Sequence, residues 1–456
     1  MIRHDEMSGR AARVGGAGSS RASPLSRVRT KLDRLPNPMV PPGRREWVAG
    51  ISYYAWSALR HVVRFQRMTL SRSTSVVTVV GSFGKTTTTR TVNAALGLPD
   101  HPRTTYSYNS FSRVAFEMFR RPWGATYAVI EVGIGKPGQM GQYADALRPT
   151  VAVVTSLGSE HLAAFESPQA LRNEKAEMVR SLPANGTAVL NGDDPHVLSM
   201  AAETKAQVIS FGFGPSNDVF LEDMRIDWPT GMHLTVHVAG REFRFKTQLI
   251  GKTMAYPVLA AMATAAALGR DLDQAAAALE RLPPTVGRIQ PVPLQEGGFV
   301  LRDDRKAAME TIHAALDLLR EIPAQRRFVV LGDISDPPPP VEARYEAVGR
   351  HVAAVADAAV VIGTDAWKFE RYRGGAIAGG MTQEQVVFAR DIPDAVYLLP
   401  TLTYGDVLLV KGRRKEKLTR LILSLAGEPV HCQVAECTLH EFCDTCRHLR
   451  RERQHW

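Results

Sequence analysis

Short apolar runs separated by amphipathic stretches occupy most of the chain from residue 75 onward. Each early run is rich in β-branched side chains and is closed by a glycine or a polar residue, which predicts buried strands. Helical spacing of apolar residues fills the intervals, so the pattern predicts a mostly parallel sheet that binds ligands at the carboxyl ends of its strands. The expected strands cover residues 75–80, 127–132, 151–155, 187–190 and 207–211.

A second alternating series follows Pro283 and Pro284. It predicts a Rossmann-like domain over residues 286–428, behind a central domain of residues 73–285. Within the central domain, residues 217–250 alternate as a small antiparallel insert, and residues 254–268 predict an Ala-rich helix. The strands expected in the second domain cover residues 299–302, 327–331, 358–362, 386–388 and 407–410.

The first 72 residues differ from the rest in charge. They hold fourteen Lys and Arg against four Asp and Glu, and this balance of 14 − 4 = +10 equals the net charge of the whole chain. Residues 1–44 are rich in Ser, Gly, Arg and Pro and predict a disordered basic leader. Residues 45–72 predict an amphipathic helix that packs on its own domain, with peripheral membrane contact through residues 1–68 as the alternative. No RNA-binding aromatic motif accompanies the basic residues, so nucleic acid is not an expected partner.

No stretch of the sequence is apolar over the length of a transmembrane helix, and no signal peptide pattern is evident at the start. All four cysteines lie between residues 432 and 446, which argues against a disulfide framework in the body of the protein. These features predict a cytoplasmic location, at the inner face of the membrane if the basic leader binds lipid.

One loop carries the sharpest chemical signal. Glycines placed between a strand and a helix let backbone N–H groups point at phosphate oxygens, the lysine neutralises β- and γ-phosphates, and the hydroxyl after it binds Mg²⁺. The sequence therefore predicts a fold of the α/β class, with a P-loop central domain and mostly parallel sheet followed by the Rossmann-like C-terminal domain. The loop residues are Gly81, Ser82, Phe83, Gly84, Lys85, Thr86 and Thr87.

The shortened loop pattern, G-x-x-G-K-T-T, resembles that of the Mur ligase family, and further motifs follow in the order that the family has them. Residues 128–133 resemble its strand that ends in an acidic Mg²⁺ ligand, and residues 155–162 are similar to its T-N-I-G-x-x-H-L segment. Residues 188–195, 330–333 and 409–412 match later strand ends. Within the family, the likeness is greatest to the group that adds D-alanyl-D-alanine to UDP-N-acetylmuramoyl-tripeptide.

The resemblance implies an ATP-dependent ligase that activates a carboxylate as an acyl phosphate and joins it to an amine. Its cofactors would be ATP and Mg²⁺, and its partners small-molecule amine and carboxylate substrates. A site of that kind gathers anions, so it needs cations and metal ions to neutralise them. The implied catalytic residues are Lys85, Glu131, His161 and Lys175, the last carbamylated in many members. The implied Mg²⁺ ligands are Thr86, Glu131, His161 and Lys175, the implied ATP contacts Arg288 and Asp303, and the implied substrate contacts Asn109 and Lys411.

Three departures from the family pattern leave another interpretation open. The segment before the Ala-rich helix lacks the asparagine that meets adenine, and residues 302–309 keep an acid but lose the family's Tyr, Asn and Pro. Arg413 stands where serine is usual. No counterpart of the family's N-terminal UDP-sugar domain is expected, and in this respect the chain is similar to the poly-γ-glutamate synthase group. The expected acceptor is therefore an amino acid, a peptide or a cell-envelope precursor. The alternative function is a degenerate or regulatory nucleotide-binding protein without ligase turnover.

The four cysteines are grouped in residues 429–456, a Cys/His-rich tail. Four thiols in a short segment suit a structural Zn²⁺ site, with redox-active or free thiols and an iron–sulfur cluster as alternatives. Because the tail follows the whole family-like body, we expect it to be separable from the ATP chemistry. The zinc ligands expected are Cys432, Cys437, Cys443 and Cys446.

Overall fold

The structure is a computed structural model, and it describes residues 56–100, 111–121, 124–159, 162–434, 437, 442–446 and 448–449. The basic leader and the first part of the expected amphipathic helix lie outside the described residues, as do Asn109 and His161. No helix among the described residues is long and apolar enough to cross a lipid bilayer.

The central domain is built on an eight-stranded sheet in the order β2-β1-β3-β4-β5-β6-β7-β8. The first six strands are parallel, and β6 to β8 extend the same sheet as an antiparallel meander where the sequence predicted the insert. The strands are β1 (Ser75–Val80), β2 (Tyr127–Glu131), β3 (Val151–Val154), β4 (Thr187–Asn191), β5 (Gln207–Gly212), β6 (Val219–Asp227), β7 (Gly231–Val238) and β8 (Arg241–Thr247).

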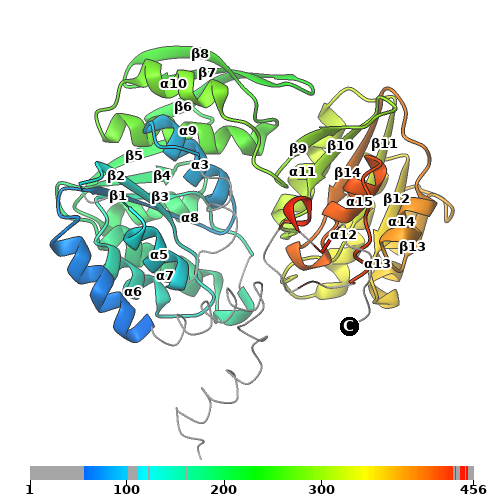
Figure 1. Cartoon of the computed structure of the whole chain (residues 1–456), viewed down its shortest axis with the longest axis horizontal. Coiled ribbons are helices and arrows are strands. Elements are labelled where there is room, and N and C mark those ends of the chain that lie inside the picture. Colours follow the sequence, from blue (N-terminus) through cyan, green and yellow to red (C-terminus); the bar gives the residue numbers. More distant parts are fainter. Residues whose placement is uncertain are drawn as a thin grey trace, which may run out of the picture. The chain divides into compact units, whose positions relative to one another are not determined.

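Both faces of this sheet are covered by helices, with α3, α9 and α10 on one face and α5, α6 and α7 on the other (Figure 1). Successive side chains of a strand point to opposite faces, so Val77 and Val79 enter one core while Val76 and Val80 enter the other. This double burial explains why four of the six residues of β1 are valines. The helices are α3 (Lys85–Ala95), α5 (Phe111–Phe119), α6 (Gln139–Leu147), α7 (Pro168–Arg180), α8 (Pro195–Leu198), α9 (Lys252–Ala267) and α10 (Leu272–Arg281).

The second domain contains a six-stranded sheet in the order β13-β12-β11-β14-β10-β9, parallel except for β9. The chain moves outward from β11 through β12 to β13 and then returns to the other side of β11, so the strand order reverses between β11 and β14. Such a reversal opens a crevice at the carboxyl ends of the strands. The strands are β9 (Gln290–Pro293), β10 (Phe299–Asp303), β11 (Arg326–Leu331), β12 (Ala358–Ile362), β13 (Val386–Ala389) and β14 (Asp406–Lys411).

Helices of this domain form two further cores with the sheet. They are α11 (Met309–Glu321), α12 (Val341–Ala353), α13 (Ala366–Ala378), α14 (Ile392–Leu398) and α15 (Thr419–Leu425). The α/β class and the two successive sheets predicted from the hydrophobic pattern are confirmed.

The helix over residues 56–68 packs differently from the pattern that predicted it. Val62 and Phe65 continue the three- and four-residue apolar spacing that predicts the helix, yet they are 51% and 67% exposed. Val63 is buried instead, and the Trp56 ring lies 5.4 Å from that of Tyr143 in α6. Polar anchors decide the orientation, because Arg67, further along the helix, is buried with its guanidinium on the backbone oxygens of residues 147 and 71. Membrane contact through residues 1–68 stays a prediction.

Candidate nucleotide and ligation site

The glycine loop follows β1 directly and ends where α3 begins at Lys85. Gly81 and Gly84 have φ angles of 149° and 83°, which side-chain-bearing residues rarely adopt. A Cβ atom on Gly81 would lie 2.0 Å from the hydroxyl oxygen of Thr155, so the turn has no room for a side chain. The result is a tight glycine turn that leads into a helix N-terminus, which is the geometry that binds phosphate through backbone N–H groups.

Two lysines converge on this loop from different helices. The Lys85 ammonium donates to the carbonyl oxygens of Gly81 at 2.8 Å and Ser82 at 2.9 Å. Lys175, in the middle of α7, donates to the Ser82 hydroxyl oxygen at 2.7 Å. Both side chains are buried. A buried ammonium is costly without anionic or oxygen partners, so this placement concentrates positive charge where an anion would bind.

Thr86 and Glu131 form a pair of oxygen donors beside the loop. The Thr86 hydroxyl donates to the Glu131 carboxylate at 2.9 Å, although β2 carries Glu131 from a distant part of the sequence. Neighbouring strands β1 and β2 run parallel, so their carboxyl ends meet at the same edge of the sheet. A hydroxyl and a carboxylate at a phosphate loop fit a hard cation such as Mg²⁺. His161 and Asn109 lie outside the described residues, so their expected places stay predictions.

The second domain contributes a buried ion pair. Asp303 ends β10 and Lys411 ends β14, and the strand register sets them side by side with 2.5 Å between the charged atoms. Burial lowers the pKa of Lys411, and the Asp303 carboxylate opposes that shift. Arg288 is half-buried, and its positive charge adds to the burial that lowers the pKa of both Lys411 and Arg305. The residues that the family resemblance assigned to this domain are thus gathered around one strand edge.

Two residues that sequence reasoning did not single out connect the central domain to the second domain. Lys306 donates to the carbonyl oxygen of Ser82 at 3.4 Å. The Glu310 carboxylate accepts hydrogen bonds from the backbone N–H and the hydroxyl of Ser159 at 2.7 and 3.1 Å. Lys306 lies inside the segment 302–309, where the sequence departs from the family pattern, and a cation in that segment was the available signal.

The region expected to meet adenine has an aromatic and charged cluster in place of the missing asparagine. Tyr256 of α9 donates to the Asp193 carboxylate at 3.0 Å and packs edge-on against Phe213, with ring centroids 4.3 Å apart. The Lys252 ammonium lies 5.0 Å from the centre of the Phe213 ring. Burial, with a smaller contribution from Asp193, raises the pKa of Tyr256 well above its ordinary value, so its hydroxyl stays protonated.

A cavity of about 890 Å³ lies in the C-terminal domain. It is lined by the loops that follow β11, β12, β13 and β14, the expected position for a ligand in a sheet whose strand order reverses. Asp333, after β11, accepts from the Lys368 ammonium at 2.8 Å and pairs with Arg413 at 2.7 Å. Arg413, the residue found where the family has serine, therefore belongs to the cavity wall.

The structure does not support the zinc site that the spacing of the tail cysteines suggested. Four sulfurs on one zinc ion lie about 3.8 Å apart, from a Zn–S distance of about 2.3 Å. All four cysteines are described, and no three of them bring their sulfurs within 4.8 Å of one another. They are free thiols, and burial raises the pKa of Cys443 to about 12. The tail is instead anchored to basic residues of the C-terminal domain, with Cys432 3.8 Å from the Arg420 guanidinium.

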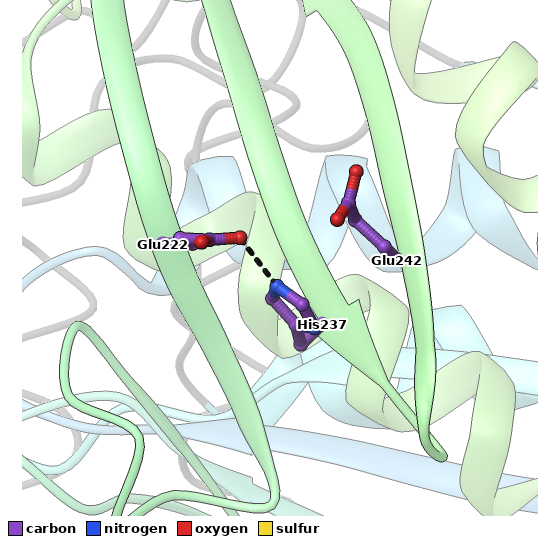
Figure 2. Close-up of side chains that lie close together, drawn as sticks. All are labelled: Glu222, His237 and Glu242. Carbon is purple, nitrogen blue, oxygen red and sulfur yellow. Dashed lines mark hydrogen bonds and ion pairs between the residues drawn. The ribbon is translucent and has the colours of Figure 1, made fainter.

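Within the described residues, one group of metal-ligating side chains does come together, on the antiparallel strands β6 to β8 (Figure 2). Glu222 sits at a bulge between Leu221 and Asp223, which turns its carboxylate to 2.6 Å from the His237 ring. Glu242 lies opposite His237 in the register of the neighbouring strands β7 and β8. Both carboxylates are exposed, so the group is accounted for as a surface ion pair.

Comparison with known proteins agrees with this geometry. The Mur ligase middle domain matches residues 79–265, and the Mur ligase glutamate ligase domain matches residues 287–414. UDP-N-acetylmuramoyl-tripeptide–D-alanyl-D-alanine ligase of Mycobacterium tuberculosis is 27% identical over 358 residues, covering 74% of this chain and 70% of the relative. The Escherichia coli enzyme of that name is 30% identical over 292 residues, covering 61% of this chain and 62% of its own.

Solved structures show the same fold. A MurF structure from Acinetobacter baumannii has a TM-score of 0.71 at 21% identity and covers 82% of this chain and 81% of its own. MurF ligase from Thermotoga maritima in complex with ADP also has a TM-score of 0.71, at 20% identity, covering 82% and 84%. With both family domains matched in order and the phosphate loop formed, the chain belongs to the Mur ligase family of ATP-dependent, amide-forming ligases.

Proposed function

We propose that the protein phosphorylates a substrate carboxylate with ATP and then joins the acyl group to an amine. The observation that carries this proposal is the contact of the phosphate loop with both lysines of its own domain and with Lys306 of the second domain. A nucleotide-binding domain alone would need no cation from a second sheet. Transfer of a phosphoryl group between two anions does need them, because negative charge accumulates at the transferred group.

Each residue of the site has a part in this chemistry. Lys85 and Lys306 would neutralise phosphate oxygens as the carboxylate oxygen attacks the γ-phosphorus and ADP leaves. Thr86 and Glu131 would hold Mg²⁺, which draws negative charge from the phosphates when bound. Lys175 lies close enough to the loop to contribute a further oxygen ligand if it is carbamylated.

The second domain would act in the amide-forming step. There the amine nitrogen attacks the acyl carbon, the C–O bond to phosphate breaks, and phosphate leaves as the amine gives up a proton. We propose that Arg288 and Asp303 contact the nucleotide and that Lys411, fixed by Asp303 at 2.5 Å, contacts the substrate. A charge held rigidly by a buried partner needs little reorganisation when the substrate charge changes.

The cavity in the C-terminal domain is the proposed binding site of the amine substrate. It joins apolar side chains such as Phe369 and Ile392 to charged ones such as Asp333 and Arg413, which suits an amino acid or short peptide with both kinds of group. The relatives named above act on UDP-N-acetylmuramoyl-tripeptide and D-alanyl-D-alanine, so these are the first carboxylate and amine to test.

The test measures ADP and phosphate release from ATP with each substrate alone and with both together, in wild type and Lys306→Ala. Release that requires both substrates and yields an amide product would support the ligase, and the Lys306→Ala rate should fall about a hundredfold or more. An exposed lysine, Lys205, gives the matched control Lys205→Ala, which should keep the wild-type rate. Tight nucleotide binding without ADP release against any carboxylate and amine pool would instead favour a regulatory nucleotide-binding protein.

A further inference from the structure

The described part of the C-terminal tail, residues 429–434, 437, 442–446 and 448–449, is held on the second domain by a forked ion pair. The Arg302 guanidinium donates to both carboxylate oxygens of Asp444, each at 3.0 Å, across 142 positions of sequence. Arg302 is 4% exposed and also contacts Asp304 at 3.1 Å. Two parallel hydrogen bonds from a buried guanidinium fix orientation as well as distance, so Asp444 has one defined place.

Further contacts hold the described part of the tail on this domain. Arg420 of α15 donates to the carbonyl oxygen of Cys432 at 3.0 Å, and the backbone N–H of Cys437 donates to the carbonyl of Lys415 at 2.9 Å. The Arg305 guanidinium lies 4.0 Å from the centre of the Phe442 ring. These partners belong to the segments after β10 and β14 and to α15, so the tail is docked at the carboxyl ends of the strands and not on a distant surface.

This docking brings the tail into the cavity. Val430, Cys432, Gln433 and Val434 line it together with the strand-end loops. Arg420 donates to the carbonyl oxygen of Cys432 in the tail and also lines the cavity, so this residue contacts both the tail and the cavity. Further along the tail, Asp444 pairs with Arg302. Arg302 directly precedes Asp303, which pairs with Lys411. The tail thus contacts both the cavity and the strand edge of the ligation site.

The lining has a definite chemical character. Apolar side chains, among them Phe369, Phe388 and Val434, share it with carboxylates and a slightly larger number of cations. The cations are Lys368, Arg390, Arg413, Lys415 and Arg420, and the carboxylates are Asp333, Asp365, Asp391 and Glu416. A ligand with an apolar body, an amino group and a carboxylate matches this lining better than a sugar or a second nucleotide would.

We propose that the tail is a wall of the amine-binding cavity and decides which amines enter it, with Val434 and Cys432 as specificity-determining residues. This inference rests on the proposed function, and it assigns to the tail a role that its cysteine spacing did not suggest. The ATP chemistry should remain separable from the tail, whereas selection of the amine should not.

The test compares Val434→Trp with Val62→Trp. Both valines are 51% exposed, but Val62 lies on the helix of residues 56–68 and does not line the cavity. With D-alanyl-D-alanine as the amine, Val434→Trp should raise the KM for the amine about tenfold or more while the KM for ATP stays within about twofold. Val62→Trp should change neither. Equal amine KM values for wild type and Val434→Trp would overturn the proposal.

A labelling experiment on the wild-type chain gives a second readout. Iodoacetamide should modify Cys432 several-fold more slowly when the amine is saturating, whereas the rate at Cys446, which does not line the cavity, should not change. An unchanged labelling rate of Cys432 at saturating amine, during active turnover, would contradict the proposal that the tail contacts the amine.

A failure of the proposed ligase function can be distinguished from a failure of the proposal that the tail lines the amine-binding cavity. If wild type turns over no carboxylate and amine pair, the proposed function fails, and the cavity is then probed with anilinonaphthalene sulfonate, an apolar anion. Its fluorescence should fall in Val434→Trp and persist in Val62→Trp. The same fluorescence in both variants would overturn the assignment of the tail to the cavity.

Discussion

Removal of the Asp303 carboxylate tests the physics of the second domain most directly. In Asp303→Ala the Lys411 ammonium, which is 1% exposed, loses its partner at 2.5 Å. Breaking a buried ion pair from one side costs about 3–5 kcal/mol, because the remaining charge stays desolvated. At about 2–4 °C of Tm per kcal/mol for a domain of this size, the expected fall in Tm is roughly 6–20 °C.

The pH dependence of that deficit gives a second signature. Burial already lowers the pKa of Lys411, and loss of Asp303 removes the interaction that opposes this shift. The folded state of the variant therefore binds fewer protons than the unfolded state, whose lysine titrates near pH ~10.4. Stability of the variant should consequently rise with pH, so its deficit should shrink between about pH 7 and pH 10.

The assay is thermal unfolding across that pH range, followed by circular dichroism. Glu346→Ala is the matched control, since its partner Arg371 lies at 3.0 Å but is half exposed, and an exposed pair contributes less than about 1 kcal/mol. The double variant Asp303→Leu with Lys411→Met should regain most of the lost stability, yet should remain inactive. A Tm of Asp303→Ala within about 2 °C of wild type, or a deficit independent of pH, would refute the reasoning.

Three further predictions concern the phosphate loop. Lys85→Ala should lower ADP release by about a thousandfold, because several kcal/mol of transition-state stabilisation depend on that charge; wild-type turnover would exclude catalysis at the loop. Lys175→Ala should lose activity that added acetate partly restores, if a carbamylated Lys175 supplies a metal ligand; full activity without acetate would show that the metal is held otherwise. Gly81→Ala should destabilise the protein by about 1–3 kcal/mol and weaken ATP binding, since its Cβ would meet the Thr155 hydroxyl at 2.0 Å; calorimetry that shows no change in either would contradict the packing.

The sequence by itself determined those features that depend on local chain geometry. Apolar runs placed β1 at residues 75–80 and β12 at 358–362, since buried parallel strands need an apolar side chain on both faces. The loop that contains Lys85 could be predicted because its glycines, the strand before it and the helix after it all lie within a few residues of one another in sequence. The family resemblance implied that Thr86 and Glu131 hold the same Mg²⁺, and the parallel strands β1 and β2 do place the two side chains at one edge of the sheet.

Only the tertiary structure decided how distant segments meet. The contact of Lys306 with the phosphate loop and the fork of Arg302 on Asp444 join parts of the chain that no periodicity relates. It also decided that Val62 faces solvent and that Val430, Cys432, Gln433 and Val434 of the tail line a cavity. Local patterns fix which positions are apolar or cationic, but a side chain's partner follows from long-range packing, where buried charges and hydrogen bonds must all be satisfied together.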